Sequence, residues 1–246
     1  MDRKINLRAG PRREACYLDF GAFAYEPVWS LQKKIVEAKI SQSLPDILIS
    51  VEHLPVYTLG KSADSSHLLI DADVLKEKNI PVFHVERGGD ITWHGPGQLV
   101  CYPIFRLNRK NSDLHKFVYL LEEAIILTLK EFGLTGGRKE SARGVWVEDQ
   151  KIASIGLAVR GRTTYHGVAL NVSPDMSFFD SIVPCGLNGV RMCSMSDLLG
   201  KAVSMAGVKE CYVGIMAGLF GLLLNTVTLK EVCETYGFEA SKIDFM

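Results

Sequence analysis

Apolar residues recur every three or four positions in several stretches of the chain, which is the spacing of a helix with one buried face. In the longest stretch, Leu114, Phe117 and Leu121 begin a continuous apolar stripe, and Gly133 follows its last turn. A glycine in that position is typical of a helix that ends there. The same spacing predicts helices at residues 27–41, 71–78, 112–132, 208–224 and 227–246.

Shorter apolar runs rich in β-branched and aromatic residues predict strands. Residues 142–172 contain three such runs joined by Asp149-Gln150 and Gly161-Arg162, the two-residue connections of an antiparallel meander. Because strands outnumber helices and strand–helix alternation is poor, we expect an α+β fold with a mixed or antiparallel sheet flanked by helices. No linker divides the chain, so residues 1–246 are expected to form a single domain. Further strands are expected at residues 15–20, 46–51, 81–85 and 99–105.

The composition excludes several classes of protein. The 246 residues include 28 basic and 28 acidic residues, so the formal net charge is zero. A neutral chain lacks the electrostatic attraction that binding to nucleic acid or anionic membranes requires, and no apolar run reaches the ~18 residues of a membrane-spanning helix. The six cysteines show no zinc-binding spacing. Since the N-terminus shows no signal-peptide pattern, we expect a cytoplasmic protein with reduced thiols and without metal or cofactor.

Glycines cluster in the segment Arg87–Pro103, RGGDITWHGPGQLVCYP, between two predicted strands. Gly88, Gly89, Gly95 and Gly97 indicate a backbone with positive φ or a close approach to another group. The segment is longer than a hairpin needs. Its spacing matches neither the dinucleotide-binding fingerprint nor the phosphate-binding loop, and no helix pattern follows it, as both motifs require. These residues alone are consistent with a functional loop or with a loop whose polar groups satisfy its own backbone.

The segment R-G-G-x-x-T-x-H-x-P-G-Q-L-x-x-Y-P resembles the signature loop of the octanoyl-[acyl-carrier-protein]:protein N-octanoyltransferases of lipoate biosynthesis, the LipB family. A second segment, Glu52–Gly60, is similar to the same family, and the resemblance extends from about residue 52 to residue 193. It implies a biotin/lipoate protein ligase-like fold and transfer of an octanoyl group from octanoyl-acyl carrier protein to apo lipoyl domains. The acceptors implied are lipoyl domains of 2-oxoacid dehydrogenase E2 subunits and the glycine cleavage H protein, and we expect a monomer.

Cys185 is the strongest candidate nucleophile among the six cysteines. It lies between Pro184 and Gly186 in an irregular stretch, where a substrate can approach closely, whereas Cys101 lies in an apolar strand pattern. These residues alone leave Cys193 as a rival. The Pro-Cys-Gly element resembles the family's catalytic cysteine, which implies that Cys185 carries the acyl group as a thioester.

Lys151 opens the predicted strand Lys-Ile-Ala-Ser-Ile-Gly, where a cation is unusual. One interpretation is a charge that protects an edge strand from aggregation. The other is a cation that stabilises a thiolate, since a thiol has an ordinary pKa of about 8.5. The K-x-x-S-x-G element matches the family's second catalytic residue, so the resemblance implies a Cys185–Lys151 dyad without a catalytic histidine.

The resemblance also places three segments around an apolar slot for the eight-carbon chain. Burying about seven methylenes at ~0.8 kcal/mol each gives roughly 5 kcal/mol before ordering costs. We expect Arg87, His94 and Asn171 to orient the site, whereas His53 fits the site and the core equally well. The substrate-binding residues implied are Arg87, Gly88, Gly89, Asp90, Ile91, Thr92, Trp93, His94, Ser154, Ile155, Gly156, Gly167, Val168 and Ala169.

Two other functions fit parts of the pattern. An ATP-dependent lipoate or biotin ligase would share the fold, but this chain has Arg-Gly-Gly-Asp in the loop and carries the Pro-Cys-Gly cysteine. A non-catalytic carrier-protein-binding module would not need both Cys185 and Lys151. The basic cluster of Arg106, Arg109 and Lys110 fits either a solvated turn or a docking point for an acidic carrier protein.

Overall fold

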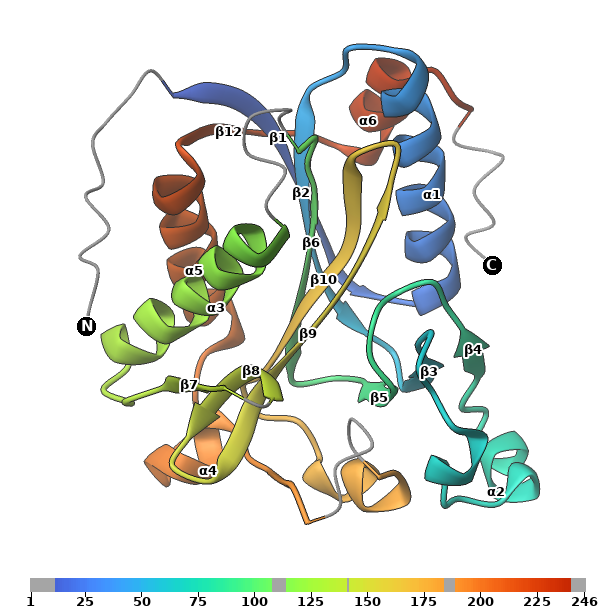
Figure 1. Ribbon diagram of the computed structural model, residues 1–246, viewed down its shortest axis with the longest axis vertical. Coiled ribbons are helices and arrows are strands. Elements are labelled where there is room, and N and C mark those ends of the chain that lie inside the picture. Colours follow the sequence, from blue (N-terminus) through green and yellow to red (C-terminus); the bar gives the residue numbers. More distant parts are fainter. Residues whose placement is uncertain (1–11, 108–113, 141, 184–188, 240–246) are drawn as a thin grey trace.

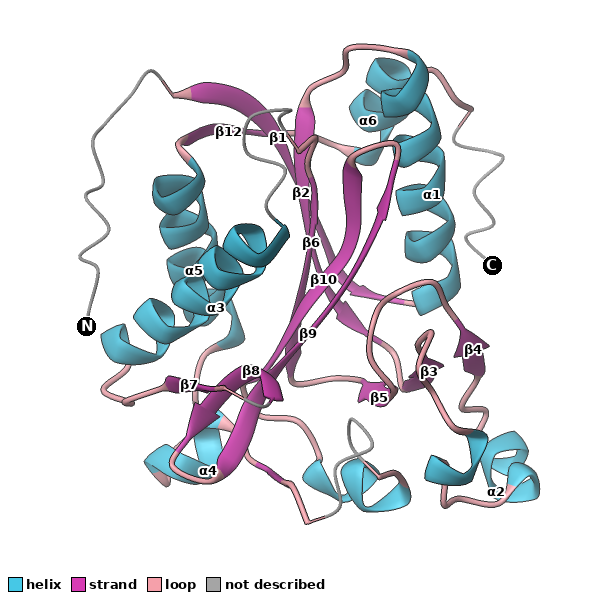
Figure 2. Ribbon diagram, in the orientation of Figure 1, coloured by secondary structure: helices cyan, strands magenta, loops and turns pink. Residues whose placement is uncertain are grey.

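The computed structural model describes residues 12–107, 114–140, 142–183 and 189–239. In this part of the chain a mixed β-sheet lies between two layers of helices (Figures 1 and 2). Helices α3 (Leu114–Glu131) and α5 (Met205–Phe220) pack on one face of the sheet, and α1 (Tyr25–Ser41) and α6 (Leu229–Tyr236) pack on the other. Each helix layer buries its apolar stripe against the sheet, so the fold has an apolar core on each face. This arrangement confirms the predicted α+β class.

Nine strands form the main sheet of the described residues, in the order β12-β1-β2-β6-β10-β9-β8-β7 with β11 beside β9. The strands β12, β1 and β2 are parallel, whereas each pair from β2 to β7 is antiparallel. The β8–β9–β10 meander confirms the tight connections predicted from the sequence. The strands are β1 (Arg13–Phe23), β2 (Asp46–His53), β6 (Gln98–Ile104), β7 (Gly137–Lys139), β8 (Ala142–Val147), β9 (Gln150–Arg160), β10 (Thr163–Asn171), β11 (Arg191–Met192) and β12 (Leu222–Thr226).

A smaller sheet pairs β3 (Val56–Leu59) with β4 (Val82–His84) and β5 (Ile91–His94). The short helices η1 (Ser65–His67) and α2 (Ala72–Glu77) connect β3 to β4. The sequence predicted a buried strand before the glycine-rich loop, but β4 is partly exposed. The loop itself contains β5, which was not predicted because its four residues are too short for an alternating pattern to stand out.

The predicted helix at residues 208–224 is wrong at its C-terminal end. Helix α5 ends at Phe220, Gly221 takes φ +61°, and the chain continues as strand β12 parallel to β1. A glycine in the left-handed region ends a helix. Leu222 is fully buried as a strand residue, so the apolar run continues across the break. The remaining short helices are η2 (Met176–Ser181) and α4 (Met195–Leu199).

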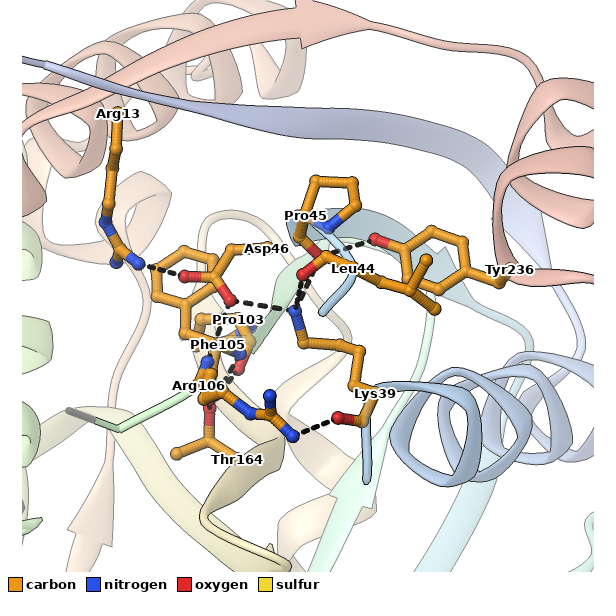
Figure 3. A network of polar contacts seen from close by, with 10 residues as sticks. All are labelled: Arg13, Lys39, Leu44, Pro45, Asp46, Pro103, Phe105, Arg106, Thr164 and Tyr236. Carbon is orange, nitrogen blue, oxygen red and sulfur yellow. Dashed lines mark hydrogen bonds and ion pairs between the residues drawn. The ribbon is translucent and has the colours of Figure 1, made fainter. Parts of the chain in front are cut away.

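A buried polar network lies where α1, β1, β2 and the end of β6 meet (Figure 3). The ammonium of Lys39 donates to the carbonyls of Leu44 (2.9 Å) and Pro45 (2.5 Å) and to Asp46 Oδ1 (3.0 Å). Asp46 also accepts hydrogen bonds from the Arg13 side chain and from the backbone N–H of Arg106. The network therefore satisfies a lysine and a carboxylate that are both almost fully buried.

Arg106 belongs to this network. Its guanidinium donates to the carbonyl of Lys39, and its backbone bridges to Thr163. Its contacts are structural, although the sequence suggested a solvated turn or a docking cluster. Arg109 and Lys110, the other members of that predicted cluster, lie outside the described residues.

Candidate active site

A cavity lies between the main sheet and the glycine-rich segment that leads into β5. The space that the centre of a water-sized sphere can reach in it is about 50 Å³, so the cavity is narrow. Every predicted substrate-binding residue except Trp93 lines this cavity. The lining residues are Tyr25, Arg87, Gly88, Gly89, Asp90, Ile91, Thr92, His94, Val100, Tyr102, Lys151, Ser154, Ile155, Gly156, His166, Gly167, Val168 and Ala169.

Glycines bring the loop and the sheet together. Gly156 in β9 pairs directly with Gly167 in β10. A Cβ at Gly156 would lie 2.9 Å from Arg87 Cδ and 3.0 Å from Gly88 O, so any larger residue would push the loop away. The N–H of Gly88 donates to Leu157 O at 2.9 Å. The close approach that the glycine-rich segment predicted is therefore an approach to β9.

Arg87 fixes a positive charge in the cavity wall. Its side chain is almost fully buried, and its guanidinium donates to Thr58 O (2.6 Å) and Thr58 Oγ1 (2.8 Å) on β3. A Cβ at Gly60 would lie 2.8 Å from Arg87 Nη1, so this glycine makes room for the guanidinium. Buried charges persist where hydrogen bonds hold them, and here those bonds come from the smaller sheet.

His94 lines the cavity as a neutral imidazole. Its Nδ1 lies 3.1 Å from Gln98 Oε1, and the amide nitrogen of Gln98 donates to Trp93 O and Asn171 Oδ1. Because an amide oxygen only accepts, His94 donates from Nδ1 and keeps Nε2 unprotonated. Burial lowers the pKa of His94 to about 3, so the ring stays neutral at physiological pH.

His53 belongs to the core and does not line the cavity. Its Nδ1 donates to Phe23 O at 3.1 Å, so its Nε2 accepts the hydroxyl hydrogen of Tyr102 at 2.8 Å. Burial lowers its pKa to about 4. The ring therefore supports Tyr102, which does line the cavity.

Trp93 and Asn171 lie beside the cavity and do not line it. Trp93 is fully buried, with its ring stacked on Phe178 at a centroid distance of 4.7 Å. Successive side chains of a strand point to opposite faces, so Trp93 turns away from the face that presents His94. Asn171 accepts from Gln98 and donates to Cys193 O (3.0 Å). Both residues hold the neighbours of the cavity in place.

Four lining residues were not predicted from the sequence: Tyr25, Val100, Tyr102 and His166. His166 is buried and takes φ +56°, which a sequence does not reveal. Its Nε2 lies 3.4 Å from Glu86 Oε2, and this contact lowers the pKa of Glu86 to about 2. One feature of the sequence could have indicated that His166 lines the cavity: it directly precedes Gly167, a predicted substrate-binding residue, in the same strand.

Lys151 reaches the cavity from β9. Only 3% of the residue is exposed, and its carbonyl accepts the N–H of Cys193 at 3.0 Å. Here β9 is flanked by β8 and β11, so Lys151 lies in an interior strand. The interpretation as a charge that protects a sheet edge is therefore wrong. Its Nζ lies 5.7 Å from the centre of the Trp146 ring, within the range of a cation–π contact.

Cys185 lies outside the described residues, but the chain on both sides of it is described. On one side the N–H of Val183 donates to His67 O at 2.9 Å. On the other side Met192 in β11 pairs with Lys151. Met192, seven positions after Cys185 in the sequence, is therefore the strand partner of Lys151.

The five described cysteines are poor nucleophiles. Burial raises the pKa of each of them, and that of the rival candidate, Cys193, rises to about 12. Since the thiolate is the attacking species, a raised pKa suppresses reactivity at neutral pH. Cys193 is therefore unsuited to nucleophilic attack.

Comparison with known proteins identifies the family. The family model of the lipoyl protein ligase A/B catalytic domain matches residues 24–216. A curated octanoyltransferase of Caldanaerobacter subterraneus is 45% identical over 216 residues, which cover 87% of this chain and 94% of that protein. The chain belongs to the octanoyltransferase family. The octanoyltransferase of Cytophaga hutchinsonii is 38% identical over 229 residues, covering 85% and 94% of the two chains.

Solved structures agree with this octanoyltransferase assignment at the level of fold. Lipoate-protein ligase A bound with ATP superposes with a TM-score of 0.72 and 17% identity, over 95% of this chain and 100% of that chain. A bipartite lipoate protein ligase from Thermoplasma acidophilum superposes with a TM-score of 0.71 and 17% identity, over 95% and 98%. These likenesses confirm the predicted biotin/lipoate protein ligase-like fold.

No described helix is long and apolar enough to cross a membrane. Within the same residues, no three or more histidine, cysteine, aspartate or glutamate side chains are grouped so that they could hold a metal ion.

Proposed function

We propose that this chain transfers an octanoyl group from octanoyl-acyl carrier protein to the ε-amine of a lysine on apo lipoyl domains, through a thioester on Cys185. The acceptors are the lipoyl domains of 2-oxoacid dehydrogenase E2 subunits and the glycine cleavage H protein. One catalytic domain, acting as a cytoplasmic monomer, performs both half-reactions. The membership in the octanoyltransferase family and the cavity that Lys151 lines support this proposal.

In the first half-reaction the Cys185 thiolate attacks the thioester carbonyl of the donor, and the bond to the carrier sulfur breaks. The ammonium of Lys151 stabilises the thiolate beforehand and protonates the departing carrier thiolate. This leaves Lys151 neutral. In the second half-reaction the acceptor amine attacks the Cys185 thioester, and neutral Lys151 takes the proton that the amine releases. The product is an amide, and Cys185 returns to the thiolate.

The lining of the cavity suits an acyl chain. Ile155, Val168 and Ala169 supply apolar contact along β9 and β10, where Gly156 lies against Arg87 and Gly167 lies against the carbonyl of Cys101. A chain of about seven methylenes gains roughly 5 kcal/mol from burial at ~0.8 kcal/mol each. The slot therefore has the chemistry for a medium-length alkyl chain.

The strand register orients the slot. Lys151 lies six positions before Leu157, and Leu157 pairs with His166, so Lys151 and His166 mark opposite ends of the lining along β9. Tyr102 lies with its ring edge-on to His166, at a centroid distance of 6.5 Å. We assign the reacting carbonyl to the Lys151 end and the methyl end of the acyl chain to the neighbourhood of Tyr102 and His166.

Mass analysis of the intact protein tests the proposal. Incubation with octanoyl-acyl carrier protein in the absence of ATP is expected to add one octanoyl group that hydroxylamine removes. Cys185→Ala should abolish the adduct, whereas Cys193→Ala, the matched control, should retain it because the Cys193 thiol is buried and has a raised pKa. An adduct on Cys185→Ala would refute the assigned nucleophile, and a requirement for ATP would favour a ligase.

Lys151→Ala tests the second member of the dyad. Removing the ammonium is expected to slow acylation of Cys185 by at least about 100-fold, the scale of general acid–base catalysis. A rate equal to that of the unmodified protein would remove Lys151 from the mechanism.

A further inference from the structure

Gly144, in β8, lies directly against the side chain of Lys151. A Cβ at this position would lie 2.7 Å from Lys151 Cε, 3.4 Å from Lys151 Nζ and 2.4 Å from Ala153 O. The φ of Gly144 is +119°, in a region that side-chain-bearing residues rarely adopt. The Lys151 side chain therefore packs where a side chain at residue 144 would begin, and the backbone conformation there depends on glycine as well.

Glu122 holds the backbone of Gly144 in this conformation. Its Oε1 accepts the N–H of Gly144 at 3.2 Å, and its Oε2 accepts Arg138 Nε at 3.0 Å. Glu122 lies on the buried side of α3, with only 8% of the residue exposed. A carboxylate there is costly unless it is paired and hydrogen-bonded. Its two partners are the arginine and the backbone that lies against Lys151.

Strand pairing beside Gly144 sets the direction of the lysine. Val145 pairs with Ala153, and the next residue, Trp146, pairs with Lys151, so Ile152 is an extra residue on β9. Such a bulge bends its strand and redirects the neighbouring side chains. The ring of Trp146 lies 5.7 Å from Lys151 Nζ. The bulge, the Trp146 ring and Gly144 therefore all lie next to Lys151.

We propose that Glu122 and Gly144 are positioning residues that fix the Lys151 ammonium at its end of the cavity. Glu122 acts through the Gly144 backbone, and Gly144 acts through the space it leaves for Lys151. Neither residue lines the cavity, so neither is assigned a contact with the acyl chain. The inference rests on the proposed function, in which Lys151 carries protons during transfer.

The first test compares two glycines in the left-handed half of the φ range. Gly144→Ala is expected to lower kcat for octanoyl transfer about tenfold or more and to leave KM for octanoyl-acyl carrier protein within about twofold, since small displacements of a catalytic group are costly. Gly133→Ala is the matched control, because Gly133 has φ +83° and a Cβ there meets nothing within 4 Å. It should leave both constants unchanged.

Labelling of Lys151 reports its position without relying on catalysis. The rate at which an amine-acylating reagent modifies Lys151, followed by peptide mass analysis, should change at least about threefold in Gly144→Ala and in Glu122→Ala. Glu122→Gln retains an oxygen that can accept the Gly144 N–H. Unlike Glu122→Ala, it should therefore keep the labelling rate of the unmodified protein and most of its kcat. The comparison of Glu122→Ala with Glu122→Gln also keeps the test informative if Gly144→Ala does not fold.

The outcomes separate the two proposals. Absence of the octanoyl adduct from the unmodified protein would overturn the proposed function, and full activity of Lys151→Ala would remove Lys151 from its mechanism, whatever the labelling shows. Loss of activity in Lys151→Ala, combined with Lys151 labelling and kcat in folded Glu122→Ala equal to those of the unmodified protein, would overturn the positioning role alone. Equal losses in Glu122→Ala and Glu122→Gln would also contradict it, because the hydrogen bond to Gly144 would then be irrelevant.

Discussion

Individual residues of the cavity combine fixed positive charge with neutral polar groups. Arg87 and Lys151 contribute cationic side chains, whereas burial keeps His94 neutral and its hydrogen bond to Gln98 leaves the lone pair on Nε2. A neutral imidazole in this partly apolar cavity avoids the large desolvation cost of a further buried charge in its wall. His94 is therefore suited to accept a hydrogen bond in the cavity, a role that does not require it to titrate during the reaction.

The neutral state of His94 predicts a dependence of stability on pH. Its folded pKa of about 3 lies below the ordinary value of about 6.5, so below pH ~6.5 the unfolded chain binds a proton that the folded protein excludes. The free energy of unfolding therefore falls as pH decreases from ~6.5, by about 2 kcal/mol for this group between pH 7 and pH 5. His94→Gln should lose about 2 kcal/mol less over that interval in urea unfolding. Equal losses would show that His94 is protonated in the folded protein.

At the scale of elements, the sequence predicted long periodic segments well. Helices α1 and α3 and the β8–β9–β10 meander appear where the patterns placed them, because each buries one continuous apolar face. Strands β5 and β12 are among the elements that the patterns missed. The four residues of β5 pair with β3 far away in sequence, and β12 follows a glycine that interrupts an otherwise helical apolar run. Both depend on tertiary pairing that local periodicity does not encode.

The site divides in the same way, into residues that a local motif predicts and residues that only tertiary folding brings to the cavity. Residues on the loop and on β9 and β10 were recognisable because their motifs resemble a family, and most of them line the cavity. Tyr25 was not, because it begins α1, far away in sequence, and reaches the cavity only through folding. Trp93 was predicted in the slot because it lies inside the motif. The direction of its side chain depends on strand β5, which the sequence did not reveal.

Helix α6 gives a prediction at this scale. Thr228 and Glu231 form a capping box, in which Thr228 Oγ1 accepts the Glu231 N–H (3.3 Å) and Glu231 accepts the Thr228 N–H (2.7 Å). Thr228→Ala should lower the free energy of unfolding by about 1 kcal/mol. Lys230→Ala, in the same helix and largely exposed, should change it by less than about 0.5 kcal/mol. Equal effects in urea unfolding would mean that the cap contributes nothing.

At the scale of the whole molecule, the cavity and the most deeply buried ion pair of the described residues occupy different places. The network around Lys39 joins α1, β1, β2 and the end of β6, and Tyr236 of α6 donates to Pro45 O at 2.9 Å in the same place (Figure 3). None of its residues lines the cavity. The network therefore connects the first described strand and the last described helix to the centre of the sheet. Its contribution should be to global stability and not to transfer.

Lys39→Met separates these two properties. The substitution leaves Asp46 buried without its ammonium partner, and loss of one member of a buried pair costs about 3–5 kcal/mol. The free energy of unfolding should fall by about 3 kcal/mol, while kcat per folded molecule stays unchanged. Arg160→Met is the control, because Arg160 pairs with Glu37 of the same helix α1 where both side chains are largely exposed, and its loss should cost under about 1 kcal/mol. If the two variants were equally stable in urea, Asp46 would be satisfied by Arg13 and the Arg106 backbone alone, and Lys39 would contribute no more than a surface charge.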